Sequence, residues 1–352
     1  MKSTKYILFI LLIAFIGSAI YIAVQPNDFS FSKTKTIEAP QEVIYNYVSD
    51  LNHWSSWAPW KKMSTSDSIL NSKEYTWLED NAIGRITTTS SSKPSTIHQD
   101  IIFSEYPKSQ LDWKIDSTSS KASTVTLTMS SKNIPFKKKA YYAFFGTPEE
   151  ELAPKFETSL TQLDSAISAS MKVYSITING ITNHSGGYYL YNTTSSKIDN
   201  YQEKVQAMMP EITNYVTENH IAMAGFPFVL YHKWDKENNA VIFSCCVPTS
   251  TQVITTNPNI LTGMLPAFKT LKTTLKGDYD YLDKAWDLTF QHLNTNSLEQ
   301  AKSNIMLETF VTNPKYKINP ADWITEIYVA LEEDSDTIPL ELKNLKLPLD
   351  DN

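Results

Sequence analysis

Cysteine is scarce in this sequence of 352 residues, which contains only two. Cys245 and Cys246 are adjacent, and adjacent cysteines are poorly placed to form a disulfide bond with each other. A disulfide framework is therefore excluded as the basis of the fold. The sequence also lacks the His and Cys spacings that are typical of a zinc site, so we expect no metal and no cofactor.

A concentration of positive charge is also lacking. The chain carries 31 Lys and Arg residues against 38 Asp and Glu residues, which gives a net charge of −7. Its densest basic run is Lys137-Lys138-Lys139, for which we predict a solvent-exposed turn. Because a protein that binds nucleic acid needs a basic patch against the phosphates, we expect no nucleic-acid partner.

The sequence does contain one long hydrophobic run, which begins at Tyr6 and ends at Val24 without a charged residue. As a helix it would be roughly 28 Å long, close to the ~30 Å thickness of the hydrocarbon core of a bilayer. A cleaved signal peptide is the alternative, but its apolar region has only about 7–15 residues and ends in a small-residue cleavage site. We therefore predict an uncleaved, single-pass membrane anchor.

The charges that flank this run bear on its orientation. Lys2 and Lys5 precede it and favour an N-terminus in the cytoplasm, although Lys33 and Lys35 follow closely behind. Long domains cross the membrane largely regardless of their own charge. We expect the soluble body to lie outside the cytoplasm.

The rest of the chain is long enough for two domains. With 41% hydrophobic and 12% aromatic residues, each of them can bury a core. The pattern of strands and helices restarts near Met171. We predict the anchor at 1–28, a first domain at 29–170, a second domain at 171–333 and an acidic, loosely ordered tail at 334–352.

The first domain is predicted to contain a strand, a helix, several strands and a long helix, in that order. Pro40 begins the first helix, at a position where its missing N–H costs nothing. Pro148 introduces the second, which carries an apolar stripe with a period of 3.6 residues. The stripe consists of Leu152, Phe156, Leu160, Leu163 and Ile167. Strands are predicted at 30–38, 74–78, 82–90, 97–104, 110–116 and 123–129.

Two segments of this domain carry a resemblance to a known family. TIEAPQEV at 36–43 ends a strand in Ala-Pro and begins a helix, and DLNHWSSWAPW at 50–60 follows with three spaced tryptophans. This order resembles the SRPBCC superfamily, also called the START-like or polyketide-cyclase-like fold. The resemblance implies a helix-grip arrangement, an antiparallel sheet around the long C-terminal helix, with an apolar ligand cavity between them. The cavity residues that it implies are Trp54, Trp57, Trp60, Phe156 and Leu160. Packing of the tryptophans in the core is the alternative.

The second domain is predicted to contain two similar halves, each with the order strand, helix, strand, strand. The segment GGYY at 186–189 is expected to be a loop. Helices are predicted at 198–209, at 211–219 and from Gly277 to about 292. Strands are predicted at 173–178, 228–233, 241–247, 267–275, 305–311 and 325–331.

Four segments of this domain carry a second resemblance: PFVLYHKWD at 227–235 with the strand that follows it to Pro248, KGDYDYLDKAW at 276–286, LETF at 307–310 with the residues up to Pro314, and WITEIY at 323–328. They resemble the GyrI-like small-molecule-binding family, whose fold is shared with effector-binding domains of drug-responsive transcription regulators. The resemblance implies a pocket in which a strand glutamate faces a cationic or polar ligand, and it maps this residue onto Glu326. The pocket walls that it implies are Tyr231, Trp286, Phe310 and Tyr328. An unpaired buried carboxylate attracts a cation, and aromatic faces add cation–π attraction. The alternative is that Glu326 pairs with a neighbouring lysine or accepts hydrogen bonds from the backbone.

Taken together, the sequence predicts an α+β protein that binds small hydrophobic or cationic molecules at a membrane. We expect it to be non-enzymatic, because no nucleophile–base or metal constellation is evident. Two other functions stay open: a hydrolase that uses Glu326 as its general base, and a ligand-sensing adaptor in the cell envelope. No helix-turn-helix precedes the second domain, so a DNA-binding regulator is not supported.

Overall fold

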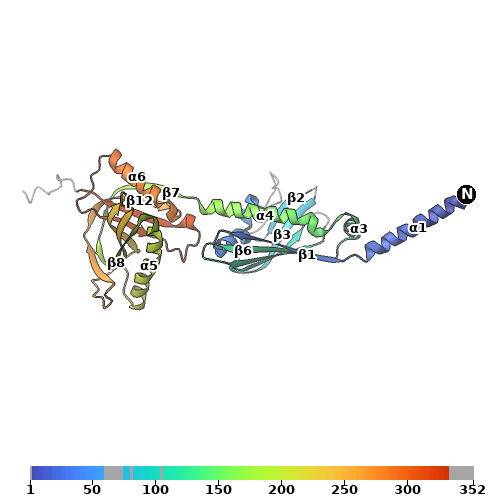
Figure 1. Cartoon of the computed structure of the whole chain (residues 1–352), viewed down its shortest axis with the longest axis horizontal. Helices are drawn as coiled ribbons and strands as arrows, with labels where there is room; N and C mark the ends of the chain where they lie inside the picture. Colours follow the sequence, from blue (N-terminus) through green and yellow to red (C-terminus); the bar gives the residue numbers. More distant parts are fainter. Residues whose placement is uncertain (1, 59–73, 80–81, 104–105, 333–352) are drawn as a thin grey trace, which may run out of the picture. The chain divides into compact units, whose positions relative to one another are not determined.

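The computed structural model describes residues 2–58, 74–79, 82–103 and 106–332 (Figure 1). The chain divides into two compact units, Met1–Met171 and Lys172–Asn352. The predicted α+β class is confirmed, with an apolar N-terminal helix, two antiparallel sheets and several further helices. Trp60 and the acidic tail at 334–352 lie outside the described residues.

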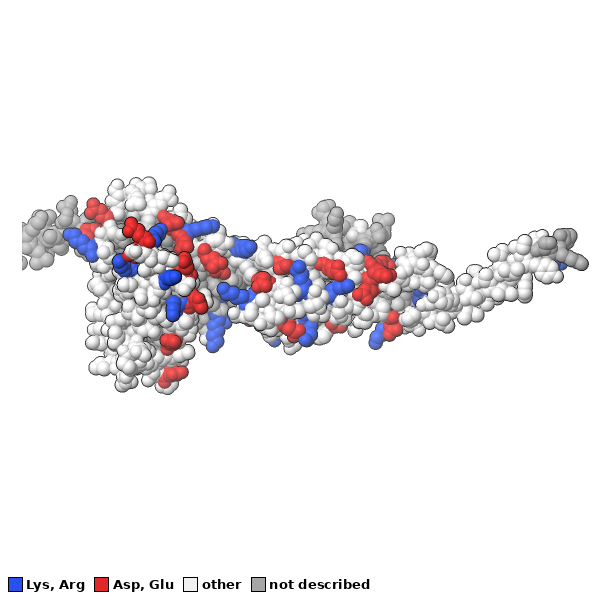
Figure 2. Space-filling view, in the orientation of Figure 1, with Lys and Arg blue, Asp and Glu red and all other residues white. Residues whose placement is uncertain are grey.

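The apolar helix α1 (Lys2–Ala23) begins the first unit. Its segment Thr4–Ala23 is long and apolar enough to cross a membrane, a criterion that a signal sequence also meets. Large apolar side chains are exposed along the whole helix, and no acidic residue lies on it (Figure 2). A helix that is apolar on every side is suited to apolar surroundings rather than to water.

The first sheet has six antiparallel strands in the order β1-β6-β5-β4-β3-β2. The strands are β1 (Asp28–Ile37), β2 (Glu74–Glu79), β3 (Ala82–Ser92), β4 (Thr96–Ile102), β5 (Ser109–Ser117) and β6 (Ser123–Lys132). In β6, buried and half-buried residues alternate, as expected for a sheet with one face against a core. Two short helical segments, α2 (Gln41–Ser49) and η1 (Leu51–Ser56), separate β1 from β2.

The long helix α4 (Pro148–Met171) packs along β1 (Figure 1). Its predicted apolar stripe faces the sheet, and Leu163 and Ile167 are fully buried. The Phe156 ring meets the Phe31 ring of β1 edge-on at 5.2 Å. Burial of this stripe holds the helix on the sheet, because side chains three and four positions apart lie on one face of a helix.

The basic run at 137–139 is not the solvent-exposed turn that we predicted. It lies in a helix, α3 (Phe136–Phe145), and Lys139 is only 8% exposed. Its ammonium group donates hydrogen bonds to the backbone oxygen of Gln25, at 3.0 Å, and to the side-chain oxygen of Asn27. These acceptors are distant in sequence, so charge density alone could not reveal them.

The second unit is built on an eight-stranded antiparallel sheet in the order β11-β8-β10-β9-β13-β14-β12-β7. Its first half comprises β7 (Ser175–His184), β8 (Gly187–Lys197), α5 (Tyr201–Glu218), β9 (Phe228–Asp235) and β10 (Ala240–Thr249). Its second half comprises β11 (Leu261–Leu265), β12 (Phe268–Lys276), α6 (Leu282–Thr295), β13 (Met306–Phe310) and β14 (Ile324–Ala330). The two halves pair through β9 and β13 at the centre of the sheet, and also through β8 with β11 and β7 with β12 at its edges. Helices α5 and α6 cover the same face.

The segment at 186–189, predicted to be a loop, begins strand β8. Gly186 and Gly187 both have positive φ angles and form the turn between β7 and β8. A Cβ at Gly186 would lie 2.3 Å from the carbonyl oxygen of Leu265, so the strand after it requires glycine at this point. Many residues of β8 are Thr, Ser or Tyr, and its pairing with β10 and β11 stabilises it.

Candidate functional site

A glutamate on the central strand β13 defines the candidate site. Glu308 is 1% exposed, although the carboxylate is among the side chains that are most costly to bury. Its partner across the ladder is Ile327 of β14, so both side chains project to the face that carries α5 and α6. An acidic residue at such a position requires hydrogen-bond partners from the covering helices.

Three aromatic side chains supply these partners. The indole Nε1 of Trp286 on α6 donates to Glu308 Oε1 at 2.5 Å. The hydroxyl of Tyr231 on β9 donates to the same oxygen at 2.8 Å, and the hydroxyl of Tyr201 on α5 donates to Oε2 at 3.0 Å. The Tyr231 oxygen also lies 2.5 Å from the Tyr201 oxygen, so the single proton of the Tyr231 hydroxyl is shared between this contact and the one to Glu308. One carboxylate thus receives hydrogen bonds from three elements, α5, β9 and α6, with donors from both halves of the second unit.

Burial dominates the electrostatics of this carboxylate. It raises the pKa of Glu308 above the ordinary value for a glutamate, while the three donors oppose that rise. Burial also raises the pKa of Tyr201 and of Tyr231 well above the ordinary value, so both hydroxyls stay protonated and able to donate. Within the part of the chain that the structure describes, no lysine, arginine or histidine forms an ion pair with Glu308.

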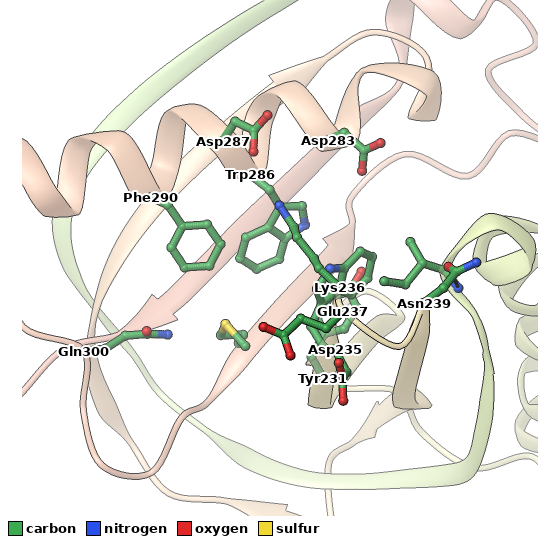
Figure 3. A pocket seen from close by; sticks show the side chains of 13 residues that line it. Tyr231, Asp235, Lys236, Glu237, Asn239, Asp283, Trp286, Asp287, Phe290 and Gln300 are labelled. Atoms are coloured by element: carbon green, nitrogen blue, oxygen red, sulfur yellow. Dashed lines mark hydrogen bonds between the residues drawn. The ribbon is translucent and has the colours of Figure 1, made fainter.

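A pocket of about 840 Å³ opens beside this network (Figure 3). Tyr231 and Trp286 line it, so two of the residues that hold Glu308 also form the pocket wall. Their rings meet nearly at right angles, with centroids 5.6 Å apart, and Phe290 stacks on Trp286 at 5.7 Å. The other lining residues are Ile198, Trp234, Asp235, Lys236, Glu237, Asn239, Asp283, Asp287, Gln300 and Met306.

The charged residues around the pocket are mostly acidic. Asp283 and Asp287 come from α6, Asp235 ends β9, and Glu237 lies in the turn that follows, where Lys236 is the basic exception (Figure 3). Hydrogen bonds from the Asn238 side chain, followed by the contact with Lys233, lower the pKa of Asp235 to about 2. The opening is therefore negatively charged at neutral pH, and its interior is aromatic.

The structure places Glu326 elsewhere than the resemblance implies. Glu326 pairs with Thr309 across the ladder, whereas Glu308 pairs with Ile327, so the two carboxylates project from opposite faces of the sheet. Glu326 forms an ion pair with Lys272, with Nζ 2.8 Å from Oε1, and accepts a hydrogen bond from the Tyr328 hydroxyl. Its expected grouping with Tyr231 and Trp286 is corrected accordingly. A ligand contact at Glu326 stays a prediction.

The other residues expected in this domain divide between the two faces. Tyr231 and Trp286 line the pocket. Phe310 lies on the side of Glu308, next to the Tyr279 ring at 5.4 Å, but outside the pocket lining. Tyr328 lies with Glu326 on the opposite face, where the ring of His184 meets it edge-on at 5.1 Å. Tyr201 and Glu308 were missed by the sequence reasoning, although a lone glutamate in an apolar strand is a usable signal.

The residues expected to line a cavity in the first unit form a packed interior where the structure describes it. Trp54 and Trp57 are buried with ring centroids 4.6 Å apart, and both meet the ring of Trp113 edge-on. The Trp54 Nε1 donates to the Val48 carbonyl at 2.8 Å. Phe156 and Leu160 are buried on α4. Trp60 lies outside the described residues. A ligand role for these side chains stays a prediction.

No protein-family model matches the chain, and no curated protein matches it. The C-terminal domain of EcmrR is 18% identical, with a TM-score of 0.39, and the match covers 46% of this chain and 99% of that domain. EcmrR in its complex with DNA is 16% identical, with a TM-score of 0.40, over 56% of this chain and 72% of EcmrR.

A different solved structure is also similar to part of the chain. The ZhuI aromatase/cyclase from Streptomyces sp. R1128 is 12% identical, with a TM-score of 0.32, over 42% of this chain and 97% of the enzyme. Similarities of this size do not establish membership of a family. The function is therefore inferred from the site itself.

Proposed function

We propose that the second unit binds a small organic cation in the pocket beside Glu308, and that α1 holds the chain at a membrane. The observation that carries the proposal is a buried carboxylate behind an aromatic pocket wall, without an ion-pair partner among the described residues. A buried charge that lacks a partner is unfavourable, and a bound cation compensates it. The pocket is thus complementary to positive charge.

The aromatic wall supports the same ligand class. Trp286 and Phe290 present stacked rings to the pocket, and Tyr231 and Trp234 add two more. A cation within about 6 Å of such a ring centroid is attracted by the ring quadrupole, by roughly 0.5–2 kcal/mol depending on its desolvation. A flat or bulky aromatic cation would gain from these rings and from the charge of Glu308 at once.

The acidic opening supports capture of the ligand from solution. Four carboxylates against one ammonium group give the rim an excess of negative charge, which raises the local concentration of cations and their association rate. The anchor α1 would keep this pocket close to a bilayer, into which lipophilic cations partition. We infer that the body lies outside the cytoplasm, and a reporter fused to the C-terminus would reveal its side.

The test is equilibrium dialysis of the full chain in detergent with two probes of the same shape. Tetraphenylphosphonium is an aromatic cation, and tetraphenylborate is its anionic counterpart. We expect the phosphonium to bind and the borate not to bind, after subtraction of protein-free detergent. Equal binding of both ions, or of neither, would refute the proposed ligand class.

Two matched variants locate the site. Glu308→Gln removes the charge while retaining the shape and an acceptor oxygen, and we expect it to weaken phosphonium binding. Glu326→Gln makes the same chemical change on the opposite face, so we expect its affinity to equal that of the wild type. The reverse pattern would assign the ligand to Glu326 and overturn our choice of pocket. It would also reopen the hydrolase alternative, in which Glu326 acts as the general base.

A further inference from the structure

Helix α3 of the first unit lies beside the C-terminal end of α1. Strand β1 begins at Asp28, shortly after α1 ends, and Asp28 pairs with Lys132, the last residue of β6. The chain then leads directly into α3, and the Ile134 N–H donates to the Asn27 carbonyl at 2.9 Å. Figure 1 shows α3 between α1 and the body of the sheet. The fold therefore fixes α3 at the point where the apolar helix meets the rest of the unit.

The inner side of α3 is held by charge-assisted contacts. The buried Lys139 donates to the segment that follows α1, through the Gln25 backbone oxygen and the Asn27 side chain. Lys138 forms an ion pair with Glu151 of α4, with Nζ 3.2 Å from Oε1, and lies 4.6 Å from the centroid of the Tyr106 ring. These contacts set the rotation of the helix about its axis, and they determine which of its residues face outward.

The outer side of α3 is aromatic and exposed. At about 100° per residue, Lys137, Tyr141, Phe144 and Phe145 lie within one arc of roughly 100°. Tyr141 is 48% exposed, Phe144 is 59% exposed and Phe145 is 72% exposed. The arc continues onto the last turn of α1, where the ring of Tyr21 lies 6.1 Å from that of Phe144. Contiguous exposed aromatic side chains of this kind mark an interaction surface.

We propose that this outer face of α3 lies in the interface of the bilayer that α1 crosses, with its aromatic rings at the level of the lipid headgroups. The inference rests on the proposed membrane anchoring and commits to lipid as the occupant, because the surface is continuous with the exposed apolar surface of α1. Tyr and Phe rings beside a basic residue are the composition of an interfacial helix. A second contact of this kind restrains how the first unit tilts about its anchor.

The test measures the depth of spin labels on the full chain in nanodiscs of phosphatidylcholine and phosphatidylglycerol. Single cysteines are introduced by Phe145→Cys, by Ile13→Cys in the middle of α1, and by Ser120→Cys. Ser120 is exposed in the turn after β5, at the end of the sheet away from α1, since Ile37 pairs with Ser123 there. The two native cysteines are fully buried, and burial raises the pKa of both thiols, so we expect neither to react with the spin label. Wild type treated with the label therefore serves as the blank.

Collisions of each label with dissolved oxygen and with a water-soluble nickel complex give its depth. We expect the ratio of oxygen to nickel collisions to be several-fold higher at position 145 than at position 120, and highest at position 13. A second label from Tyr141→Cys should agree with position 145, which guards against a local disturbance. Near-ultraviolet circular dichroism verifies that each labelled chain is folded.

Three outcomes would overturn the inference, and they are distinguishable. If position 13 reports the bilayer but position 145 behaves like position 120, then α1 is an anchor and α3 lies in water. If position 13 itself behaves like position 120, both the anchoring proposal and this inference are refuted. Spin–spin broadening at position 145 that disappears on dilution with unlabelled chain would show that a second copy, rather than lipid, covers this face.

Discussion

We predict that loss of the hydrogen bond between Trp286 and Glu308 destabilises the second unit by an amount that depends on pH. Trp286→Phe removes the Nε1 donor but retains an aromatic ring in the pocket wall. Tyr231 and Tyr201 still donate to the carboxylate. The variant therefore changes one of three hydrogen bonds to Glu308, at a site where that residue is 1% exposed.

The loss of stability in Trp286→Phe has two parts that respond differently to pH. The smaller ring leaves unfilled space, which costs roughly 1–2 kcal/mol at every pH. The lost hydrogen bond to an ionised carboxylate costs a further ~1.5–3 kcal/mol. This second part applies only where Glu308 is ionised in the folded state, and burial raises its pKa. We therefore expect the cost of Trp286→Phe to grow as the pH rises through the folded-state pKa of Glu308.

The pH dependence of wild-type stability follows from the same rise in the pKa of Glu308. Because its pKa is raised in the folded state, its contribution to stability is fully present below the unfolded value and is lost as the pH rises through the folded value. The Trp286 donor limits that loss by lowering the pKa. Removal of the donor raises the pKa further, so the variant loses stability more steeply with pH than the wild type does.

Hydrogen–deuterium exchange over β13 and α6 measures the local free energy of opening without treating the whole chain as two-state. A double-mutant cycle with Glu308→Gln, run between about pH 4 and pH 8, isolates the charged interaction. In the Glu308→Gln background the pH-dependent part of the Trp286→Phe cost should disappear. A cost that is constant across this range, or unchanged in the Glu308→Gln background, would refute the reasoning.

Three further predictions use other parts of the chain. Asp283→Asn together with Asp287→Asn should slow the association of tetraphenylphosphonium and weaken its dependence on salt concentration, as stopped-flow fluorescence at two ionic strengths would reveal. Lys139→Met removes the buried ammonium group that binds the segment after α1, so limited proteolysis of that segment should accelerate, whereas Lys137→Met on the outer side of α3 should leave the rate unchanged. Leu163→Ala on α4 should destabilise the first unit by about 2–5 kcal/mol, seen in exchange of the β1 amides, with phosphonium affinity retained.

Much of the architecture could be predicted because its signals are local. The stripe through Leu152 and Ile167 has the period of a helix with one buried face, and α4 follows it. Regular alternation in β5 and β6 likewise fixes which residues face the core. Such patterns need no knowledge of distant partners. They were sufficient for the fold class and for most of the elements.

The missed features depend on partners that are distant in sequence. Lys139 in α3 is buried because acceptors near Gln25 reach it, and β8 is a strand because β10 and β11 flank it. The choice between Glu308 and Glu326 required the pairing register of β13 with β14, since a shift of one position moves a side chain to the opposite face. A sequence alone does not supply that register.

The position of Glu308 at the junction of the two halves makes the site depend on a difference between them. A symmetric pair of separate, identical half-domains would place two equivalent carboxylates near the axis between β9 and β13, where they would repel each other in a dry interior. Joined in one chain, the halves are free to differ, and Tyr201 and Tyr231 of the first half donate to the single acid of the second. Separation of the halves would therefore leave the acid without two of its three donors, so neither half carries the site alone.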